Sequence, residues 1–338
     1  MKKIVVLLFV IGLVSCNTAQ TNYTATKKLT RIDYANTITA ENLKTHLYQF
    51  ADDKMQGRMT GEPGQKMAAE YLKNFYISQG ITSPWGNNSY FQAIPAEYFG
   101  RQKEPKPSEN VVAFIKGSEK PDEVIVLSAH YDHVGMRDGE IYNGADDDGS
   151  GTVSLLEIAE AFQKAVKDGH GPKRSLLFLH VTGEEIGLYG SKYYTENPIF
   201  PLENTVCNLN TDMVGRIAPE KKDNPNYVYL IGSDKLSQEL HDVSEMINEK
   251  YTHLELDYTF NDENDPNRFY YRSDHYNFAK NNIPVIFYFN GVHEDYHKPT
   301  DTPDKIEYEL MAKRAKLIFQ TAWELANREG RITADKLK

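Results

Sequence analysis

Short apolar runs alternate with amphipathic segments along most of the chain. Runs of four to eight apolar residues predict strands at residues 110–115, 123–128, 175–181, 206–209, 227–231 and 284–289. Apolar residues at helical spacing predict helices at residues 41–50, 64–79, 153–162, 188–196, 236–250, 274–280 and 309–327. Because strands that alternate with helices are typical of βαβ crossovers, we predict an α/β fold with a mostly parallel mixed sheet and helices on both faces.

The first residues have the pattern of a targeting segment. Lys2 and Lys3 precede an apolar run at residues 4–14, which is too short to span a bilayer as a helix and has the length of a signal peptide. The run ends in Leu-Val-Ser-Cys at residues 13–16, which resembles a bacterial lipobox whose Cys16 is acylated. A plain secretory signal with an incidental cysteine is the alternative.

We therefore predict three parts: a signal peptide at residues 1–15, a lipidated tether at 16–34 and a single domain at 35–330, because no Pro/Gly-rich linker divides the chain. With Cys16 acylated, Cys207 is the one remaining cysteine, so an internal disulfide is excluded. The formal net charge of −10 becomes −12 without Lys2 and Lys3. This acidic balance argues against nucleic-acid binding, which favours a basic face.

Polar and acidic residues follow several of the predicted strands. His130 and Asp132 come after the second strand, Glu184 and Glu185 after the third, and Asp212 after the fourth. Each feature alone has an ordinary explanation: a packing pair, a chance Glu pair or a turn residue. In open α/β sheets, however, ligands bind at the carboxyl ends of the strands, so together these residues predict a metal site at one sheet edge.

An acidic loop, Gly-Ala-Asp-Asp-Asp-Gly-Ser-Gly at residues 144–151, opens the helix after the second strand. Acidic residues and Ser are favoured at helix starts for capping alone. Capping needs one carboxylate, whereas three adjacent carboxylates repel one another, and a bound cation would relieve that repulsion. The loop therefore supports the prediction of a metal site.

The segment His-Glu-Asp-Tyr-His at residues 293–297 has the letters of the zincin motif H-E-x-x-H. That motif requires a helix, so that both His side chains share one face. Gly291, Pro299 and Pro303 surround the segment and predict a loop. We therefore reject the zincin interpretation, although one His of the loop can still be a metal ligand.

The ordered motifs together resemble the secreted bacterial leucyl-type aminopeptidases with two co-catalytic zinc ions, metallopeptidase family 28. The resemblance extends over roughly residues 50–325, and its motifs are residues 55–64, 128–135, 143–151, 182–187, 208–215, 272–275, 296–297 and 300–306. It implies a zinc-exopeptidase fold of the phosphorylase/hydrolase-like type and identifies residues 35–330 as one zinc aminopeptidase domain.

The resemblance also implies a set of metal ligands. His130 and Asp212 would hold one zinc, Glu185 and His297 would hold the other, and Asp147 would bridge the two. It further implies a cis peptide bond after Asp147.

The remaining roles that the resemblance implies are catalytic. Glu184 would be the general base, Asp132 the partner of the His130 ring, and Tyr296 a hydroxyl that stabilises the oxyanion. For the side-chain specificity pocket, the aromatic residues between Tyr251 and Tyr271 are candidates, and they are equally compatible with a place in the core.

The resemblance implies a di-zinc exopeptidase that removes N-terminal amino acids from peptides by a hydroxide bridging two Zn²⁺ per chain. The expected partners are peptide substrates, with a membrane reached only through lipid on Cys16. Asn17 after Cys16 favours the outer membrane of a bacterial envelope. Three alternatives remain: a glutaminyl cyclase with one zinc, a non-catalytic binding lipoprotein, and dipeptidase or carboxypeptidase action within the same fold.

Overall fold

The structure is a computed structural model, and it describes residues 29–86, 88–100 and 103–337. The predicted signal peptide, the lipid site at Cys16 and most of the tether lie outside the described residues. Within the described part of the chain, no helix has both the length and the apolar character that crossing a membrane requires.

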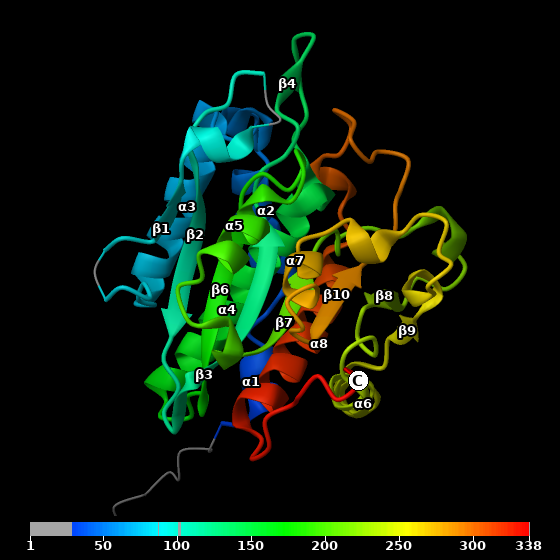
Figure 1. Ribbon diagram of the computed structural model, residues 1–338. Helices are drawn as coiled ribbons and strands as arrows, with labels where there is room; N and C mark the ends of the chain where they lie inside the picture. The colour runs from blue at the N-terminus through cyan, green and yellow to red at the C-terminus, as the bar shows by residue number, and fades with distance from the viewer. Residues whose placement is uncertain (1–28, 87, 101–102, 338) are drawn as a thin grey trace, which may run out of the picture.

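A central eight-stranded sheet organises the molecule (Figure 1). In spatial order its strands are β1 (Phe91–Ile94), β2 (Ser108–Ile115), β6 (Arg174–Val181), β3 (Lys120–His130), β7 (Thr205–Thr211), β10 (Val285–Phe289), β8 (Tyr227–Ile231) and β9 (Glu255–Asp257). The central strands β6, β3, β7 and β10 run parallel, whereas β1, β2 and β8 pair with their inner neighbours in the antiparallel sense. The predicted mostly parallel mixed sheet is confirmed.

Helices cover both faces of the sheet, as the apolar character of its strands predicts. One face packs against α1 (Arg31–Ala35), α2 (Ala40–Phe50), α3 (Pro63–Gln79), α4 (Gly151–Lys167), α6 (Gln238–Ile247) and α8 (Tyr308–Asn327). The other face packs against the shorter α5 (Tyr189–Glu196) and α7 (His275–Ala279), which lie in front of the sheet in Figure 1.

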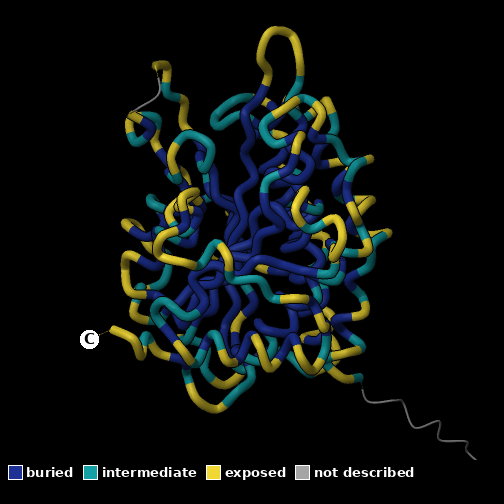
Figure 2. The backbone as a smooth tube through the Cα atoms, turned by 90° about the vertical axis from the view of Figure 1, so that its right-hand side faces the viewer, coloured by how far each residue is buried: buried dark blue, intermediate teal, exposed yellow. Residues whose placement is uncertain are grey.

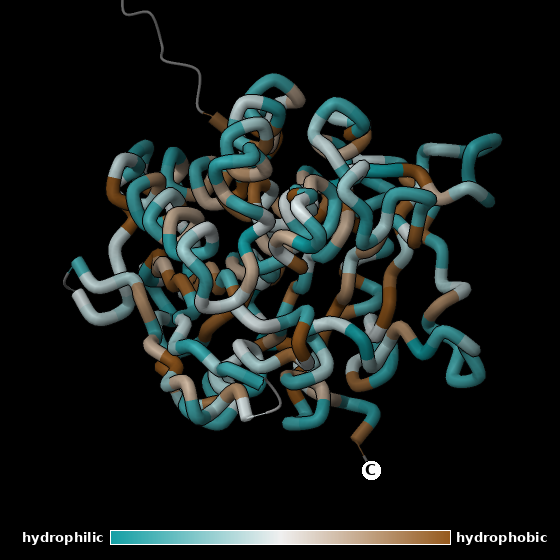
Figure 3. The backbone as a smooth tube through the Cα atoms, turned by 90° about the horizontal axis from the view of Figure 1, so that it is seen from above, coloured by the Kyte–Doolittle hydropathy of each residue, from teal (hydrophilic) through white to brown (hydrophobic). Residues whose placement is uncertain are grey.

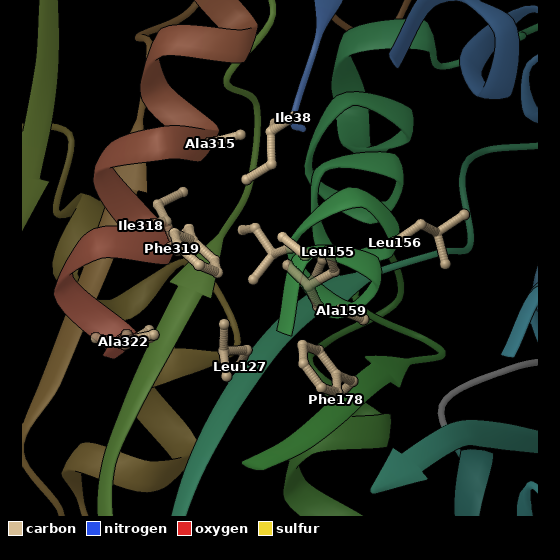
Figure 4. Packing of buried hydrophobic residues seen from close by; sticks show 14 of the residues in the cluster. Ile38, Leu127, Leu155, Leu156, Ala159, Phe178, Ala315, Ile318, Phe319 and Ala322 are labelled. Carbon is tan, nitrogen blue, oxygen red and sulfur yellow. The ribbon is translucent and has the colours of Figure 1, made fainter. Parts of the chain in front are cut away.

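The larger core lies between the sheet and the helix pair α4 and α8. Leu155 and Ala159 of α4 and Ile318 and Phe319 of α8 meet Leu127 of β3 in this layer (Figure 4). All five side chains are fully buried. Figure 2 shows that the buried segments lie inside the molecule and that the exposed segments lie mainly in its outer loops. Burial of this apolar layer makes the strand positions rigid, and these strands carry the site.

Two features of the sheet differ from the sequence-based expectation. The edge strands β1 and β9 are short and were not predicted, and β2 begins at Ser108, two residues before the predicted strand at residues 110–115. A two-stranded hairpin of β4 (Met136–Arg137) and β5 (Glu140–Ile141) projects from the top of the molecule in Figure 1. It emerges directly from the segment that follows His130.

The carboxyl ends of the four central parallel strands lie at the top of the sheet in Figure 1. Viewed from this end, the loops at the periphery are mainly hydrophilic and enclose more hydrophobic segments (Figure 3). The loops after β3, β6, β7 and β10 therefore converge over one edge, as expected for the ligand-binding end of an open α/β sheet.

Candidate metal centre

Each predicted ligand reaches the centre from the end of a central strand or from the loop that follows it. His130 is the last residue of β3, and Asp212 directly follows β7. Glu185 follows β6 after a turn at Gly183, and His297 lies in the loop after β10. Asp147 belongs to the acidic loop, which forms an irregular helical turn at Ala145–Ser150.

The structure brings these five side chains together around Asp147. His130 Nε2 lies 3.2 Å from Asp147 Oδ1 and 3.6 Å from Asp212 Oδ1. On the other side, His297 Nε2 lies 3.0 Å from both Asp147 Oδ2 and Glu185 Oε2. The two oxygens of Asp147 thus face two different His–carboxylate pairs.

The donor set fits zinc. Two imidazoles and three carboxylates are the ligand types that Zn²⁺ prefers, and bonds of about 2.1 Å place tetrahedral ligand atoms roughly 3.4 Å apart. The spacings of 3.0 to 3.6 Å between the imidazole and carboxylate atoms are of this size. The arrangement has one set of donors on each side of Asp147, so it can accommodate a pair of ions.

The electrostatics of the cluster favour positive charge between the carboxylates. Burial opposes ionisation of Asp147, but hydrogen bonds from His130 and His297 hold its pKa well below the usual value. Burial lowers the pKa of the His297 ring, yet hydrogen bonds to Asp147 and Glu185 outweigh burial and raise that pKa to about 10. The carboxylates thus stabilise a cation at the position where a metal ion would bind.

Asp148 sits next to Asp147 but has different partners. Its Oδ1 accepts hydrogen bonds from the backbone N–H groups of Gly151 and Met213, each at 3.0 Å, and its Oδ2 accepts one from His130 at 3.2 Å. A ligand atom of Asp148 does lie within 4.8 Å of those of His130 and Asp212. Because three backbone N–H groups already bind its oxygens, Asp148 supports the loop, and Asp147 remains the candidate metal ligand.

His133 is a residue of the centre that the sequence analysis missed. Its Nδ1 lies 2.7 Å from Glu185 Oε1 and 3.8 Å from Asp147 Oδ2, and the ring is buried. His133, Asp147 and Glu185 also form a group whose ligand atoms lie within 4.8 Å of one another. The signal was visible in the sequence, since a second His follows His130 by three residues, but spacing alone gives no reason to prefer it.

The model of peptidase family M28 matches residues 110–322, which is 213 of the 338 residues. This segment contains all five predicted ligands. The chain belongs to peptidase family M28.

Individual proteins similar to this M28 chain agree with that membership. A probable leucine aminopeptidase of Trichophyton verrucosum is 29% identical over 275 residues, covering 77% of this chain and 71% of its own length. The first curated relatives are matched over less of their length, between 25% and 57% in the first three.

Solved structures share the fold at lower sequence identity. A zinc aminopeptidase from Bacillus subtilis superposes with a TM-score of 0.66 at 17% identity, over 89% of this chain and 97% of that one. A glutaminyl cyclase from Porphyromonas gingivalis gives the same TM-score at 18% identity, over 84% and 97% of the two chains. These similarities establish the fold, and the type of reaction has to be inferred from the residues of the site.

The contacts of Asp132 in this M28 centre differ in part from the expectation. The nearest acceptor to His130 Nδ1 is the backbone oxygen of Asp132 at 3.1 Å, whereas the Asp132 carboxylate is 3.8 Å away. The carboxylate instead accepts the backbone N–H of Glu184 at 3.2 Å and the hydroxyl of Thr60 at 2.9 Å. Asp132 therefore supports both the His130 ring and the turn that carries Glu184.

A chain of buried polar side chains supports Asp212 from below. Ser273 Oγ donates a hydrogen bond to Asp212 Oδ2 at 2.6 Å and accepts one from Asn210 Nδ2 at 2.8 Å. Asn210 Oδ1 in turn accepts a hydrogen bond from Ser128 Oγ at 2.7 Å. These contacts fix the orientation of the Asp212 carboxylate, as outer-shell partners of metal ligands commonly do.

Residues 293–297 form a loop, as predicted, and only His297 of the two histidines faces Asp147. His293 Nε2 lies 3.1 Å from Asp146 Oδ2, which is a separate contact beneath the acidic loop. The loop is held by Asp295, whose carboxylate binds Arg216 at 3.0 Å and Lys305 at 2.6 Å. The H-E-x-x-H letters therefore contribute one ligand candidate.

Arg58 connects a segment upstream of the family match to the candidate metal centre. Its guanidinium is fully buried and donates to four backbone oxygens, those of Phe50, Tyr131, Asn143 and Gly144, at 2.7 to 3.2 Å. Two of these oxygens lie at the start of the acidic loop, and a third belongs to the residue after His130. Arg58 thus joins the upstream turn to the segments that carry the ligands.

Glycine is required where the acidic loop enters α4. A Cβ atom on Gly151 would lie 2.3 Å from Asp148 Oδ1 and 2.5 Å from the backbone oxygen of Thr211. No side chain fits in that space, so Gly151 lets the loop approach the end of β7. The peptide bond between Asp147 and Asp148 is cis in the structure, as the resemblance implied.

A small pocket with a volume of about 30 Å³ opens beside the centre. Its polar wall contains Asp147, Glu184 and Asp212, and its remaining lining is Met213, Phe269, Arg272, Phe287, Phe289, Val292 and Tyr296. The pocket adjoins a wider, solvent-open hollow, with which it shares Phe269, Arg272, Val292 and Tyr296. Of the aromatic residues between Tyr251 and Tyr271, Phe269 therefore does line a pocket.

Proposed function

We propose that this M28 chain is a zinc-dependent aminopeptidase that hydrolyses N-terminal amino acids from peptides with two Zn²⁺ per chain. The observation that carries the proposal is the position of Asp147 between two His–carboxylate pairs, with Glu184 alongside. The printed names of two similar proteins, a probable leucine aminopeptidase and a zinc aminopeptidase, support this choice of reaction.

In this proposal His130 and Asp212 would hold one zinc, Glu185 and His297 would hold the other, and Asp147, whose oxygens face both pairs, would contribute to both. Paired zinc ions lower the pKa of the attacking water and polarise the scissile carbonyl. The charge balance supports the assignment: two Zn²⁺ supply +4, while Asp147, Glu185, Asp212 and one hydroxide supply −4 in total. His133 lies against Glu185 and orients its carboxylate.

Glu184 serves as the general base. Its Oε2 lies 4.0 Å from His130 Nε2, and its side chain lines the pocket instead of joining a His–carboxylate pair. Burial raises the pKa of the Glu184 carboxyl well above its usual value, while His130 opposes that rise. A raised pKa suits a group that takes a proton from water and passes it to the leaving amine near neutral pH.

Tyr296 is placed to assist at the carbonyl. Its ring stacks on the His297 ring with 3.9 Å between centroids, and it lines the pocket next to Asp147. Burial, followed by the nearby charges of Asp147 and Glu185, raises the pKa of the phenol, so it stays a proton donor. A neutral hydroxyl at this position stabilises the oxyanion that develops during the reaction.

The test is a panel of aminoacyl-nitroanilides and short peptides, with zinc analysis and reversal of chelator treatment. Two zinc ions per chain and release of single N-terminal residues support the proposal. A glutaminyl cyclase would instead carry one zinc and convert N-terminal Gln to pyroglutamate. Release of C-terminal residues, or cleavage restricted to dipeptides, would replace the aminopeptidase assignment by the corresponding exopeptidase.

We also propose that the protein is a lipoprotein of a bacterial envelope, anchored by lipid on Cys16. The lipobox-like residues 13–16 support this location. Incorporation of labelled palmitate into the wild type, and its loss in Cys16→Ser, would support the anchor. A secreted, unlabelled wild-type protein would show that residues 1–15 are a plain secretory signal.

A further inference from the structure

Arg272 brings a positive charge into a pocket whose other charged residues are acidic. Arg272 lines both the pocket beside the metal centre and the adjoining hollow. The other charged residues in these two linings are Asp147, Glu184, Asp212 and Glu220. Arg272 is therefore the one basic residue among the described residues that line this route to the centre.

Among the described residues, no carboxylate forms an ion pair with the guanidinium of Arg272. Its one recorded side-chain contact in the described part of the chain is with the Phe269 ring, whose centroid lies 4.8 Å from the guanidinium carbon. Phe269 is itself buried and packs edge-on against Phe260 at 4.8 Å and at a tilt against Phe289 at 5.0 Å between centroids. Stacking on this aromatic wall holds the cation at the rim of the pocket and leaves its N–H donors free for a ligand.

The shape and composition of the pocket indicate which part of a substrate meets Arg272. If the scissile carbonyl of a substrate lies beside Asp147 and Glu184, the apolar wall of Phe269 and Val292 is available to the side chain of its N-terminal residue. A side chain with a short methylene stem and an anionic end matches an apolar wall that is followed by the Arg272 guanidinium at the rim. Its stem contacts the apolar wall and its carboxylate reaches the guanidinium.

We propose that Arg272 is a specificity-determining residue that lets the pocket accept acidic N-terminal side chains, Glu above all, in addition to apolar ones. This inference rests on the proposed aminopeptidase function. An acidic side chain entering the pocket would otherwise meet the carboxylates of Glu184 and Asp212, and the Arg272 charge offsets that repulsion. The planar guanidinium also binds a carboxylate through two parallel N–H donors.

The experiment compares glutamyl-, glutaminyl- and leucyl-nitroanilides on the zinc-loaded wild type and on Arg272→Met and Arg272→Lys. Glu and Gln have the same shape, so their ratio isolates the charge. We expect Arg272→Met to lower kcat/KM for the glutamyl substrate about 10-fold or more, mainly through KM, and to change the glutaminyl and leucyl values less than about threefold. Arg272→Lys should retain part of the glutamyl activity.

Arg268→Met is the matched control. Arg268 belongs to the same segment and stacks on Tyr271 at 4.8 Å, but it lines neither pocket. We expect this variant to leave all three rates unchanged. A readout that does not require turnover is thermal stabilisation by free glutamate compared with glutamine, which should favour glutamate in the wild type and disappear in Arg272→Met.

The outcomes separate this inference from the proposed function. Equal losses for Glu and Gln substrates, or an unchanged Glu-to-Gln ratio in Arg272→Met, would overturn the role of Arg272 while leaving the aminopeptidase in place. The role of Arg272 would also be overturned if the loss of activity in Arg272→Met depended on the free α-carboxylate of dipeptide substrates and not on their N-terminal side chain. If the wild type releases no N-terminal residue from any substrate, the proposed function itself fails.

Discussion

Asp147 and Asp148 are neighbours in the chain with different partners: Asp147 lies between the rings of His130 and His297, whereas Asp148 is bound by three backbone N–H groups. The acidic loop therefore divides its carboxylates between the proposed metal site and the support of its own backbone. This division resolves the repulsion that three adjacent Asp residues would otherwise create, and it can be tested one residue at a time.

Replacing Asp147 should abolish binding of the metal pair. We expect Asp147→Ala to lose at least one of two zinc ions, because both His–carboxylate pairs depend on the bridging oxygens. Metal analysis after dialysis measures the stoichiometry. Two retained zinc ions per chain would contradict the bridging role.

Asp148→Asn is the companion variant, and we expect it to change stability but not zinc binding. It should keep the zinc stoichiometry of the wild type. It should lower the free energy of unfolding by about 1–3 kcal/mol, because the amide NH₂ cannot accept from the backbone N–H groups that the carboxylate binds. Urea unfolding of the metal-free protein checks stability, and loss of zinc without loss of stability would reverse our assignment of the two residues.

Glu184→Gln should separate catalysis from metal binding. The variant keeps the shape of the side chain but cannot accept a proton, so we expect two bound zinc ions and a kcat reduced about 100-fold or more. Glu185→Gln, at the adjacent position, should instead lose zinc from the His297 side. Turnover close to that of the wild type in Glu184→Gln would rule out Glu184 as the base.

The buried ring of His180 should make the fold sensitive to acid. Its Nε2 lies 2.6 Å from the Tyr76 hydroxyl, and burial lowers the pKa of the ring to about 3, below its ordinary value of 6.5. The folded state therefore keeps His180 neutral where the unfolded chain binds a proton. Its contribution to stability is fully present above pH 6.5 and is lost progressively as the pH falls towards 3.

The variant His180→Gln should reduce that sensitivity. Between pH 8 and pH 5, the free energy of unfolding of the metal-free protein should fall by about 2 kcal/mol less in the variant than in the wild type. His275 is likewise buried with a pKa lowered to about 3, but it is present in both proteins and cancels in the comparison. Parallel pH profiles for the two proteins would show that His180 does not titrate on unfolding.

Arg58 should be essential for stability although it lies outside the metal centre. Arg58→Met removes the guanidinium donor from four buried backbone oxygens, of which that of Gly144 keeps the N–H of Gly149, so we expect the free energy of unfolding to fall by at least about 3 kcal/mol. Arg331 also donates to two backbone oxygens, those of Glu203 and Thr205, but nearer the surface, and Arg331→Met should cost about 1 kcal/mol. Equal losses in the two variants would argue against a special role for Arg58.

The sequence predicts the central strands and the residues at their ends because both are local features. His130 and Asp212 stand at the ends of apolar runs, and parallel strands place such ends at one edge without further information. The division of Glu184 and Glu185 into base and ligand came from the family resemblance, and in the structure only Glu185 pairs with His297.

Other features depend on contacts between distant segments, which a single sequence does not display. His133 belongs to the centre because it contacts Glu185, which lies 52 residues later in the chain. The edge strands β1 and β9 form only because the rest of the sheet is there to pair with them. The partners of Arg58 are backbone oxygens, which carry no sequence signature at all.

The position of α1 determines how a tethered molecule would face its surroundings. Arg31 in α1 donates to Gln320 and Glu324 in the last turns of α8, and Arg174 at the start of β6 donates to the backbone of Leu325 and Arg328 just beyond. The described chain thus starts at the amino ends of the strands, opposite the metal centre (Figure 1). If lipid on Cys16 anchors the protein, the described chain continues towards that anchor from the end of the molecule opposite the pocket, which leaves the mouth of the pocket open to peptides arriving from the aqueous side.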